Sequence, residues 1–196
     1  MSSALFIIDV QNDFTEGGAL GVTGGGAVAA GITRLLAAHP ESYGHVFASR
    51  DWHDGDNDNG GHFSESPDFV DSWPVHCVAG STGAGYHSAL DLGPSVIHVR
   101  KGQGVASYSI FEGTTDSGEM VQHALSRLGV TTIDVVGIAT DHCVLASALD
   151  ALGAGFTVRV LTDLVAGVAP ESSAAALERL ASAGATVISS TTPWAP

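Results

Sequence analysis

Short apolar runs rich in valine and isoleucine alternate along this chain with alanine- and leucine-rich stretches that have helical spacing. The apolar runs are continuous rather than alternating, which is typical of strands buried on both faces of a parallel sheet. They cover residues 5–10, 45–49, 96–99, 132–138, 157–161 and 186–188. Because strands alternate with helices, the sequence predicts a doubly wound α/β fold with a mainly parallel six-stranded sheet and helices on both faces.

Four stretches between these runs place apolar residues on one face of a helix. The four faces comprise Val28, Ile32, Leu35 and Leu36; Val121, Leu125 and Leu128; Val144, Ala148 and Leu152; and Leu177, Leu180 and Ala181. Most of these helices are expected to end at a glycine, namely at Gly129, at Gly153 or Gly155, and at Gly184.

Residues 52–94 form a segment that fits neither pattern. The segment is polar, rich in glycine, aspartate, serine and proline, and has almost no hydrophobic periodicity. An ordered loop of that length inside a compact domain is usually functional. We therefore predict one domain over residues 1–196, with a functional loop inserted at about 52–94.

The charge of the chain limits its partners. Seven basic residues against 21 acidic ones give a net charge of −14, which argues against nucleic acid and membrane partners because both bind basic patches. No apolar run is long enough to cross a membrane, and the first residues lack the basic start of a signal peptide. We expect a cytoplasmic protein, and the oligomeric state stays open, a homo-oligomer included.

Reactive residues follow several of the predicted strands. Asp9, Asp51 and Lys101 stand at or just after the ends of the first three apolar runs, and the stretch 137–143 ends the fourth. Ligands of open α/β sheets bind beyond the carboxyl ends of the strands, so we expect these groups to meet at one edge. Lys101 is the only lysine of the chain and opens a glycine-rich loop, where the alternative is a solvated surface lysine.

Cys143 lies just after a predicted strand, where a helix is expected to begin. A helix N-terminus lowers the pKa of a thiol and offers N–H groups to an oxyanion, so the position favours a nucleophile. The alternative is a small buried hydrophobic residue. Cys77, in the polar segment, is interpreted as structural, and a Cys77–Cys143 disulfide is not expected in the cytoplasm.

Asp51 and His53 flank Trp52, so in an extended chain their side chains project to the same side. His62 and His76 follow in the same polar segment. Aspartate and histidine together suit Zn²⁺, Fe²⁺ or Mn²⁺, with positions left open to water. The alternative is a solvated loop with scattered histidines.

The spacing of the acidic residues between positions 54 and 65 partly matches that of an EF-hand calcium loop. The sixth position of such a loop needs glycine for its sharp turn, and here it is Asn59. No amphipathic helix flanks the segment, although an EF-hand needs two. We therefore do not expect calcium.

Five short motifs occur in order along the chain. They are Asp-Val-Gln-Asn-Asp-Phe at 9–14, Asp-Trp-His at 51–53, Ser-Trp-Pro-Val-His-Cys at 72–77, Lys-Gly at 101–102 and Gly-Ile-Ala-Thr-Asp-His-Cys-Val at 137–144. Together they resemble the cysteine hydrolases related to isochorismatase and, within that superfamily, the nicotinamidase/pyrazinamidase branch. The resemblance extends from residue 4 to about residue 190.

The resemblance implies a catalytic triad. Cys143 would be the nucleophile, Asp9 the acid/base and Lys101 the third member. A cis peptide would join Ile138 to Ala139, and the N–H groups of Ala139 and Cys143 would face the oxyanion.

The resemblance also implies a metal site and a pocket. The ligands of one divalent ion (zinc, iron or manganese) would be Asp51, His53, His62 and His76. Because the stretch before His62 is longer than is usual in the relatives, Glu65 stays an alternative to His62. The residues expected to line the substrate pocket are Phe14, Leu20, Trp73, Tyr108 and His142.

The reaction implied is the hydrolysis of nicotinamide to nicotinate and ammonia, as in NAD salvage, and of pyrazinamide to pyrazinoate. The expected partner is thus a small aromatic carboxamide. Two alternatives stay open. One is another hydrolase of the superfamily, of the isochorismate or carbamoyl-amide type, and the other is a non-catalytic binding protein on the same fold.

Overall fold

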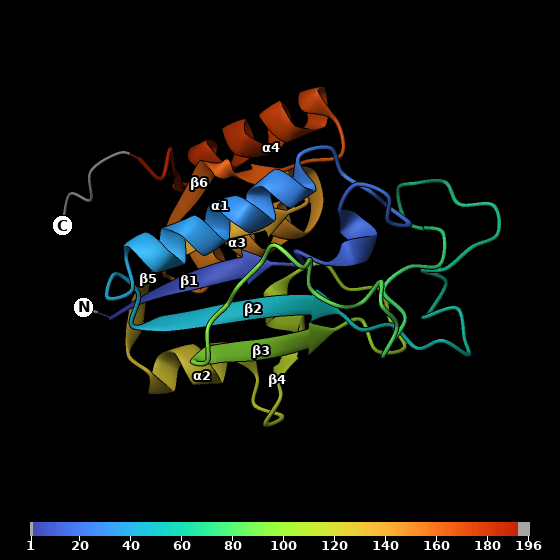
Figure 1. Ribbon diagram of the computed structural model, residues 1–196, viewed down its shortest axis with the longest axis horizontal. Coiled ribbons are helices and arrows are strands. Elements are labelled where there is room, and N and C mark those ends of the chain that lie inside the picture. The colour runs from blue at the N-terminus through green and yellow to red at the C-terminus, as the bar shows by residue number, and fades with distance from the viewer. Residues whose placement is uncertain (1, 192–196) are drawn as a thin grey trace.

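The computed structural model describes residues 2–191, and in it seven strands form one sheet in the order β4-β3-β2-β1-β5-β6-β7 (Figure 1). The strands are β1 (Ser2–Ile8), β2 (His45–Asp51), β3 (Val96–Lys101), β4 (Thr114–Thr115), β5 (Val130–Ile138), β6 (Thr157–Ala166) and β7 (Thr186–Ile188). All neighbours pair in parallel except β3 and β4. The predicted doubly wound α/β fold is confirmed, and residue 1 and residues 192–196 of the predicted domain lie outside the described residues.

The predicted number of strands was one too low. The additional strand, β4, has two residues and pairs antiparallel with β3 through Val99 and Arg100. A strand of two threonines at the sheet edge leaves no apolar run in the sequence, so the pattern could not reveal it.

Within residues 2–191, four α-helices cover the sheet: α1 (Gly25–Ala38), α2 (Val121–Arg127), α3 (Leu145–Gly153) and α4 (Pro170–Ser182). Leu5 and Ile7 of β1 pack in the core on the side of α1, whereas Phe6 and Ile8 pack on the side of α2, α3 and α4. Both faces of the sheet are therefore buried, which explains the continuous apolar runs. No helix within residues 2–191 is both long and apolar enough to span a membrane.

The helix ends follow the glycine signals. Gly129, Gly155 and Gly184 each lie two residues beyond α2, α3 and α4, with φ angles of 64°, 89° and 106°. These angles lie in the left-handed region that glycine adopts without a steric penalty. The sequence left Gly153 and Gly155 as alternative glycines at the end of α3. In the structure, Gly153 is the last residue of the helix, and Gly155 adopts the left-handed conformation beyond it.

The chain reverses its direction of winding at β1. The strands β2 and β3 build outward on one side of β1, and β5, β6 and β7 lie on the other side. A crevice at such a reversal, beyond the carboxyl ends of the strands, is the usual ligand site of open α/β folds. Residues 52–95, between β2 and β3, contain no helix or strand. The first part of this segment lies beyond the arrowheads of these strands, and its last part runs back across the sheet to the start of β3 (Figure 1).

Candidate active site

Lys101, the last residue of β3, is completely buried and lies between three reactive groups. Its Nζ atom is 3.0 Å from Asp9 Oδ2 and 3.8 Å from Cys143 Sγ, and it forms an ion pair with Asp51 Oδ1. Burial alone would lower the pKa of Lys101, but the two carboxylates raise it well above its usual value. The lysine is therefore a buried cation, and the alternative of a solvated loop lysine is wrong.

Asp9 directly follows β1 and is also fully buried. Its φ angle of 46° is uncommon for a residue with a side chain, and such conformations concentrate at functional sites. Ser49 Oγ donates a hydrogen bond of 2.7 Å to Asp9 Oδ1. Burial raises the pKa of Asp9, and the Lys101 ammonium opposes that rise. A buried carboxyl group whose pKa is raised in this way is suited to take up and return a proton during a reaction.

Cys143 lies in a π-helical turn, η3 (Thr140–Val144), directly before α3. Burial raises the pKa of its thiol well above the usual value, while Lys101 opposes the rise. The expected lowering of the thiol pKa by a helix N-terminus is therefore wrong for the free site. Cys143 keeps its proton until a neighbouring base removes it.

Three histidines of the β2–β3 segment meet beside this cluster. Ligand atoms of His53, His62 and His76 lie within 4.8 Å of one another, and all three residues are buried. Burial lowers the pKa of His62 to about 4 and also lowers that of His76, so both rings are neutral near pH 7 and can bind a metal. Two buried ring nitrogens, His53 Nε2 and His62 Nδ1, have no hydrogen-bond partner among the described residues. These features fit a bound cation.

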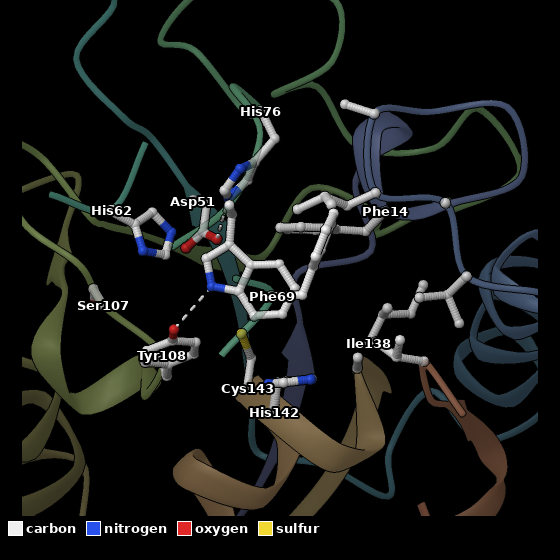
Figure 2. A pocket seen from close by; sticks show the side chains of 17 residues that line it. Phe14, Asp51, His62, Phe69, His76, Ser107, Tyr108, Ile138, His142 and Cys143 are labelled. Carbon is white, nitrogen blue, oxygen red and sulfur yellow. Dashed lines mark hydrogen bonds and ion pairs between the residues drawn. The ribbon is translucent and has the colours of Figure 1, made fainter. Parts of the chain in front are cut away.

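Asp51, the last residue of β2, belongs both to the cluster around Lys101 and to the histidine cluster. Its Oδ1 contacts Lys101, whereas its Oδ2 lies 3.7 Å from His53 Nε2 and 3.9 Å from His76 Nε2. Burial alone would raise the pKa of Asp51, but Lys101 and the histidines hold it well below its usual range. Asp51 is therefore an ionised carboxylate with one oxygen directed at the histidine cluster (Figure 2).

Asp9, Asp51 and Cys143 also bring ligand atoms within 4.8 Å of one another, a spacing that could suit a second metal ion. Lys101 Nζ contacts all three of these residues. An ammonium group already supplies the positive charge there, so we assign the metal site to the histidines.

Backbone carbonyls orient two of the histidine rings. His53 Nδ1 lies 2.7 Å from the carbonyl oxygen of Gly102, and His76 Nδ1 lies 2.8 Å from that of Pro74. Donation from Nδ1 leaves Nε2 as the metal-binding atom, which is the usual arrangement of a ligand histidine. In both rings Nε2 is the atom that faces Asp51.

Gly102→Ala is expected to weaken metal binding about 10- to 100-fold, the usual effect of disturbing an outer partner of a ligand. A Cβ atom at Gly102 would lie 2.5 Å from Cε1 of the His53 ring, at a φ of 81°. Metal content measured by elemental analysis after dialysis checks this. Gly80→Ala is the matched control, since Gly80 has a φ of 77° but nothing within 4 Å of an added Cβ. Equal metal loss in both variants would contradict the role of Gly102.

Glu65, the alternative fourth ligand, is exposed, whereas His62 is buried within the histidine cluster. The structure thus brings His62 rather than Glu65 to the other histidines. Asn59, the residue that argued against a calcium loop, is buried, and its side chain accepts hydrogen bonds from the backbone of Asp54 and Gly104. It therefore holds the longer loop before His62 in place.

A cavity of about 320 Å³ opens onto Cys143, Asp51, His62 and His76 (Figure 2). The five residues predicted to line the substrate pocket all line this cavity: Phe14, Leu20, Trp73, Tyr108 and His142. Trp73 Nε1 donates a hydrogen bond of 3.1 Å to Tyr108 Oη, which fixes two aromatic walls relative to each other. The peptide between Ile138 and Ala139 is cis, as the resemblance implied.

Sequence reasoning gave no role to several residues of the site. Gln11 is buried, donates to the carbonyl of Asp51 at 2.9 Å and accepts from its N–H at 2.8 Å, so it clamps the end of β2. Ser49 positions Asp9. A polar residue inside an apolar run, or directly after one, is the signal that could have revealed both. Phe69 and Val168, which also line the cavity, carried no such signal.

The fold and the site together define a doubly wound α/β protein with a buried thiol–carboxylate–ammonium cluster and an adjoining histidine site suited to a metal. The isochorismatase domain family matches residues 3–192, and the chain belongs to that family.

The chain is similar over nearly its whole length to characterised relatives. It is 46% identical to the nicotinamidase/pyrazinamidase of Mycobacterium tuberculosis, with 95% of this chain and 98% of that protein covered. It is 35% identical to the nicotinamidase of Escherichia coli, with 94% and 93% covered. Among solved structures, the pyrazinamidase of Pyrococcus horikoshii in complex with zinc has a TM-score of 0.84 at 34% identity, with 96% and 99% covered.

Proposed function

We propose that this protein is an amidohydrolase that converts nicotinamide to nicotinate and ammonia, and pyrazinamide to pyrazinoate. The relatives described above support this reaction, because nicotinamidases and pyrazinamidases match the chain from end to end. The observation that carries the proposal is the contact of Lys101 with Asp9, Asp51 and Cys143 at the base of an aromatic-walled cavity.

One divalent metal ion fits the proposed site. Asp51, His53, His62 and His76 would hold it, in keeping with the zinc complex of the Pyrococcus horikoshii relative. Histidine and carboxylate ligands suit zinc, iron or manganese. When bound, the ion would supply a Lewis acid that positions the ring nitrogen of the substrate, directly or through water.

The proposed covalent chemistry is carried out by Cys143 and Asp9. Asp9 accepts the thiol proton while the sulfur attacks the carboxamide carbon, and the protonated Asp9 then donates that proton to the leaving ammonia. Water next attacks the resulting thioester while Asp9 accepts one of its protons. Asp9 then returns this proton to the departing Cys143 sulfur, so the acid leaves and the thiol is restored. Asp9 is thus the proton carrier of every step, while Lys101 supplies a fixed positive charge beside it.

Two further roles follow from the same geometry. The backbone N–H groups of Ala139 and Cys143 are proposed to bind the oxyanion of the tetrahedral intermediate; loss of one such donor typically costs about 100-fold in rate. Phe14, Trp73 and Tyr108 are proposed to hold the aromatic ring, since flat apolar walls favour stacking and edge contacts.

An ammonia-release assay with purified protein and nicotinamide tests the proposal, with elemental analysis of the same sample. The expected result is turnover together with about one transition-metal ion per chain. Release of ammonia from a carbamoyl amide but not from nicotinamide would contradict it, as would ligand binding without any turnover.

Removal of the metal by a chelator is expected to lower nicotinamide turnover about 10-fold or more, because the substrate ring would lose its positioning contact. Re-addition of Zn²⁺, Fe²⁺ or Mn²⁺ should restore the rate in wild type but not in His53→Ala. An unchanged rate in the metal-depleted protein would refute a role for the ion. The cytoplasmic location stays a prediction.

A further inference from the structure

Two apolar side chains lie at the mouth of the cavity although they are largely exposed to solvent. Phe69 is 57% exposed and Val168 is 58% exposed, and both line the cavity. Phe69 comes from the β2–β3 segment, whereas Val168 comes from the loop between β6 and α4. Apolar groups exposed at the rim of a pocket often mark a binding site.

The backbone holds Phe69 in a fixed turn. Its φ angle of 58° is unusual for an aromatic residue, and such conformations persist only where the surrounding structure imposes them. Here Asp68 Oδ1 imposes it by accepting hydrogen bonds from the N–H groups of Val70, Asp71 and Ser72, at 3.0, 3.0 and 2.9 Å, and from Ser72 Oγ at 3.0 Å.

The turn directs the ring of Phe69 against the wall of the pocket. Its centroid lies 6.1 Å from that of Trp73 at an interplanar angle of 84°, an edge-to-face contact. In Figure 2, Phe69 lies in the middle of the view into the cavity. The side chain is therefore held at the entrance rather than in bulk solvent.

Val168 is held by a second carboxylate. Asp141 Oδ1 accepts a hydrogen bond of 3.0 Å from the N–H of Val168, and Asp141 Oδ2 accepts one of 3.3 Å from that of Ala169. Asp141 belongs to η3, the turn that also carries Cys143. The position of Val168 at the mouth is thus fixed relative to the reactive sulfur.

We propose that Phe69 and Val168 form a rigid gate that limits the size of the substrate ring. The gate admits single-ring carboxamides and excludes rings that carry a large substituent on the edge remote from Cys143 and the histidines. This inference rests on the proposed amidase function. Phe69 and Val168 determine specificity, and Asp68 and Asp141 are positioning residues.

The gate is tested with nicotinamide and with 5-phenylpyridine-3-carboxamide, whose phenyl group is attached at C5, remote from the carboxamide and the ring nitrogen. In Phe69→Ala, the ratio of kcat/KM for the phenyl substrate to that for nicotinamide should rise about 10-fold or more, the range in which pocket contacts discriminate substrates. In Phe69→Ala, kcat for nicotinamide should stay within about threefold of the wild-type value, whereas KM should rise. The reason is that the variant loses a contact made equally in the ground and transition states. Val168→Ala should change the ratio in the same direction.

Val70→Ala is the matched control, because Val70 is 70% exposed in the same turn and does not line the cavity. It should leave the ratio unchanged. Asp68→Ala should raise the ratio as Phe69→Ala does, whereas Asp68→Asn should keep the wild-type ratio because its amide oxygen still accepts the hydrogen bonds of the turn.

The outcomes separate the gate from the function on which it rests. Wild type that releases no ammonia from nicotinamide overturns the proposed function and the gate together. Active wild type whose ratio changes equally in Phe69→Ala and Val70→Ala overturns the gate alone. Failure of Asp68→Asn to restore the ratio overturns the positioning role of Asp68.

Discussion

Cys143→Ala is expected to lower kcat for nicotinamide hydrolysis by about 10⁴-fold or more, because removal of a covalent nucleophile leaves only the binding contributions to catalysis. The thiol is buried and close to both Lys101 and Asp9, so no water-exposed group can take its place. Single-turnover assays of ammonia release measure the loss. The thermal unfolding midpoint should change little, since alanine fills most of the same space.

Cys77→Ala provides the matched control. Cys77 is the second cysteine, also free and buried, and burial raises the pKa of its thiol as well. Its contribution to the site comes from the backbone, through a carbonyl that accepts from the N–H of His53 at 3.1 Å. Activity should therefore stay within about fivefold of wild type. Residual turnover by Cys143→Ala above about 1% of wild type would rule out the nucleophile assignment.

Lys101→Met is expected to lower both activity and stability strongly. Methionine keeps the apolar stem but removes the only cation that contacts the buried carboxylates of Asp9 and Asp51 in the described site. Removing one partner of a buried ion pair costs about 3–5 kcal/mol of unfolding free energy. The rate should fall about 100-fold or more, since both the thiolate and the oxyanion lose a nearby positive charge.

The loss of stability in Lys101→Met should become smaller as the pH falls. In wild type, Lys101 holds the pKa of Asp51 below its usual range against the effect of burial, so this stabilisation is present at neutral pH and is lost as the pH falls. In Lys101→Met, the unpaired carboxylates take up protons already at higher pH. The difference in unfolding free energy between the two proteins should therefore shrink from pH 7 to pH 4.

Urea unfolding of metal-depleted wild type and Lys101→Met at several pH values measures this difference. Lys101→Arg should recover part of the stability and little of the activity, because the guanidinium keeps the charge but is broader and planar. Alkylation of Cys143 by iodoacetamide, in a Cys77→Ala background, should need higher pH in Lys101→Met than in its parent. A pH-independent stability difference together with identical alkylation profiles would contradict the assigned role of Lys101.

The sequence by itself determined the layers of the fold and the edge at which the site lies. Continuous apolar runs required strands buried on both faces, and the residues that end those runs, Asp9, Asp51 and Lys101, stand together at the carboxyl edge. That inference succeeded because side-chain periodicity and parallel pairing are local consequences of burial. The ordered motifs predicted the family, which the comparisons confirm, and also the proposed ligand histidines and pocket residues; hydrophobic periodicity carries no information on any of these.

Only the tertiary structure decided how the site groups interact. It showed that burial raises the pKa of Cys143, that His62 rather than Glu65 joins the other histidines, and that Gln11 clamps Asp51. It also brought Phe69 and Val168, 99 positions apart in the sequence, to one cavity mouth. Burial, charge and contact at these positions depend on neighbours from distant segments, and a local pattern records that a residue is buried but not which side chains surround it.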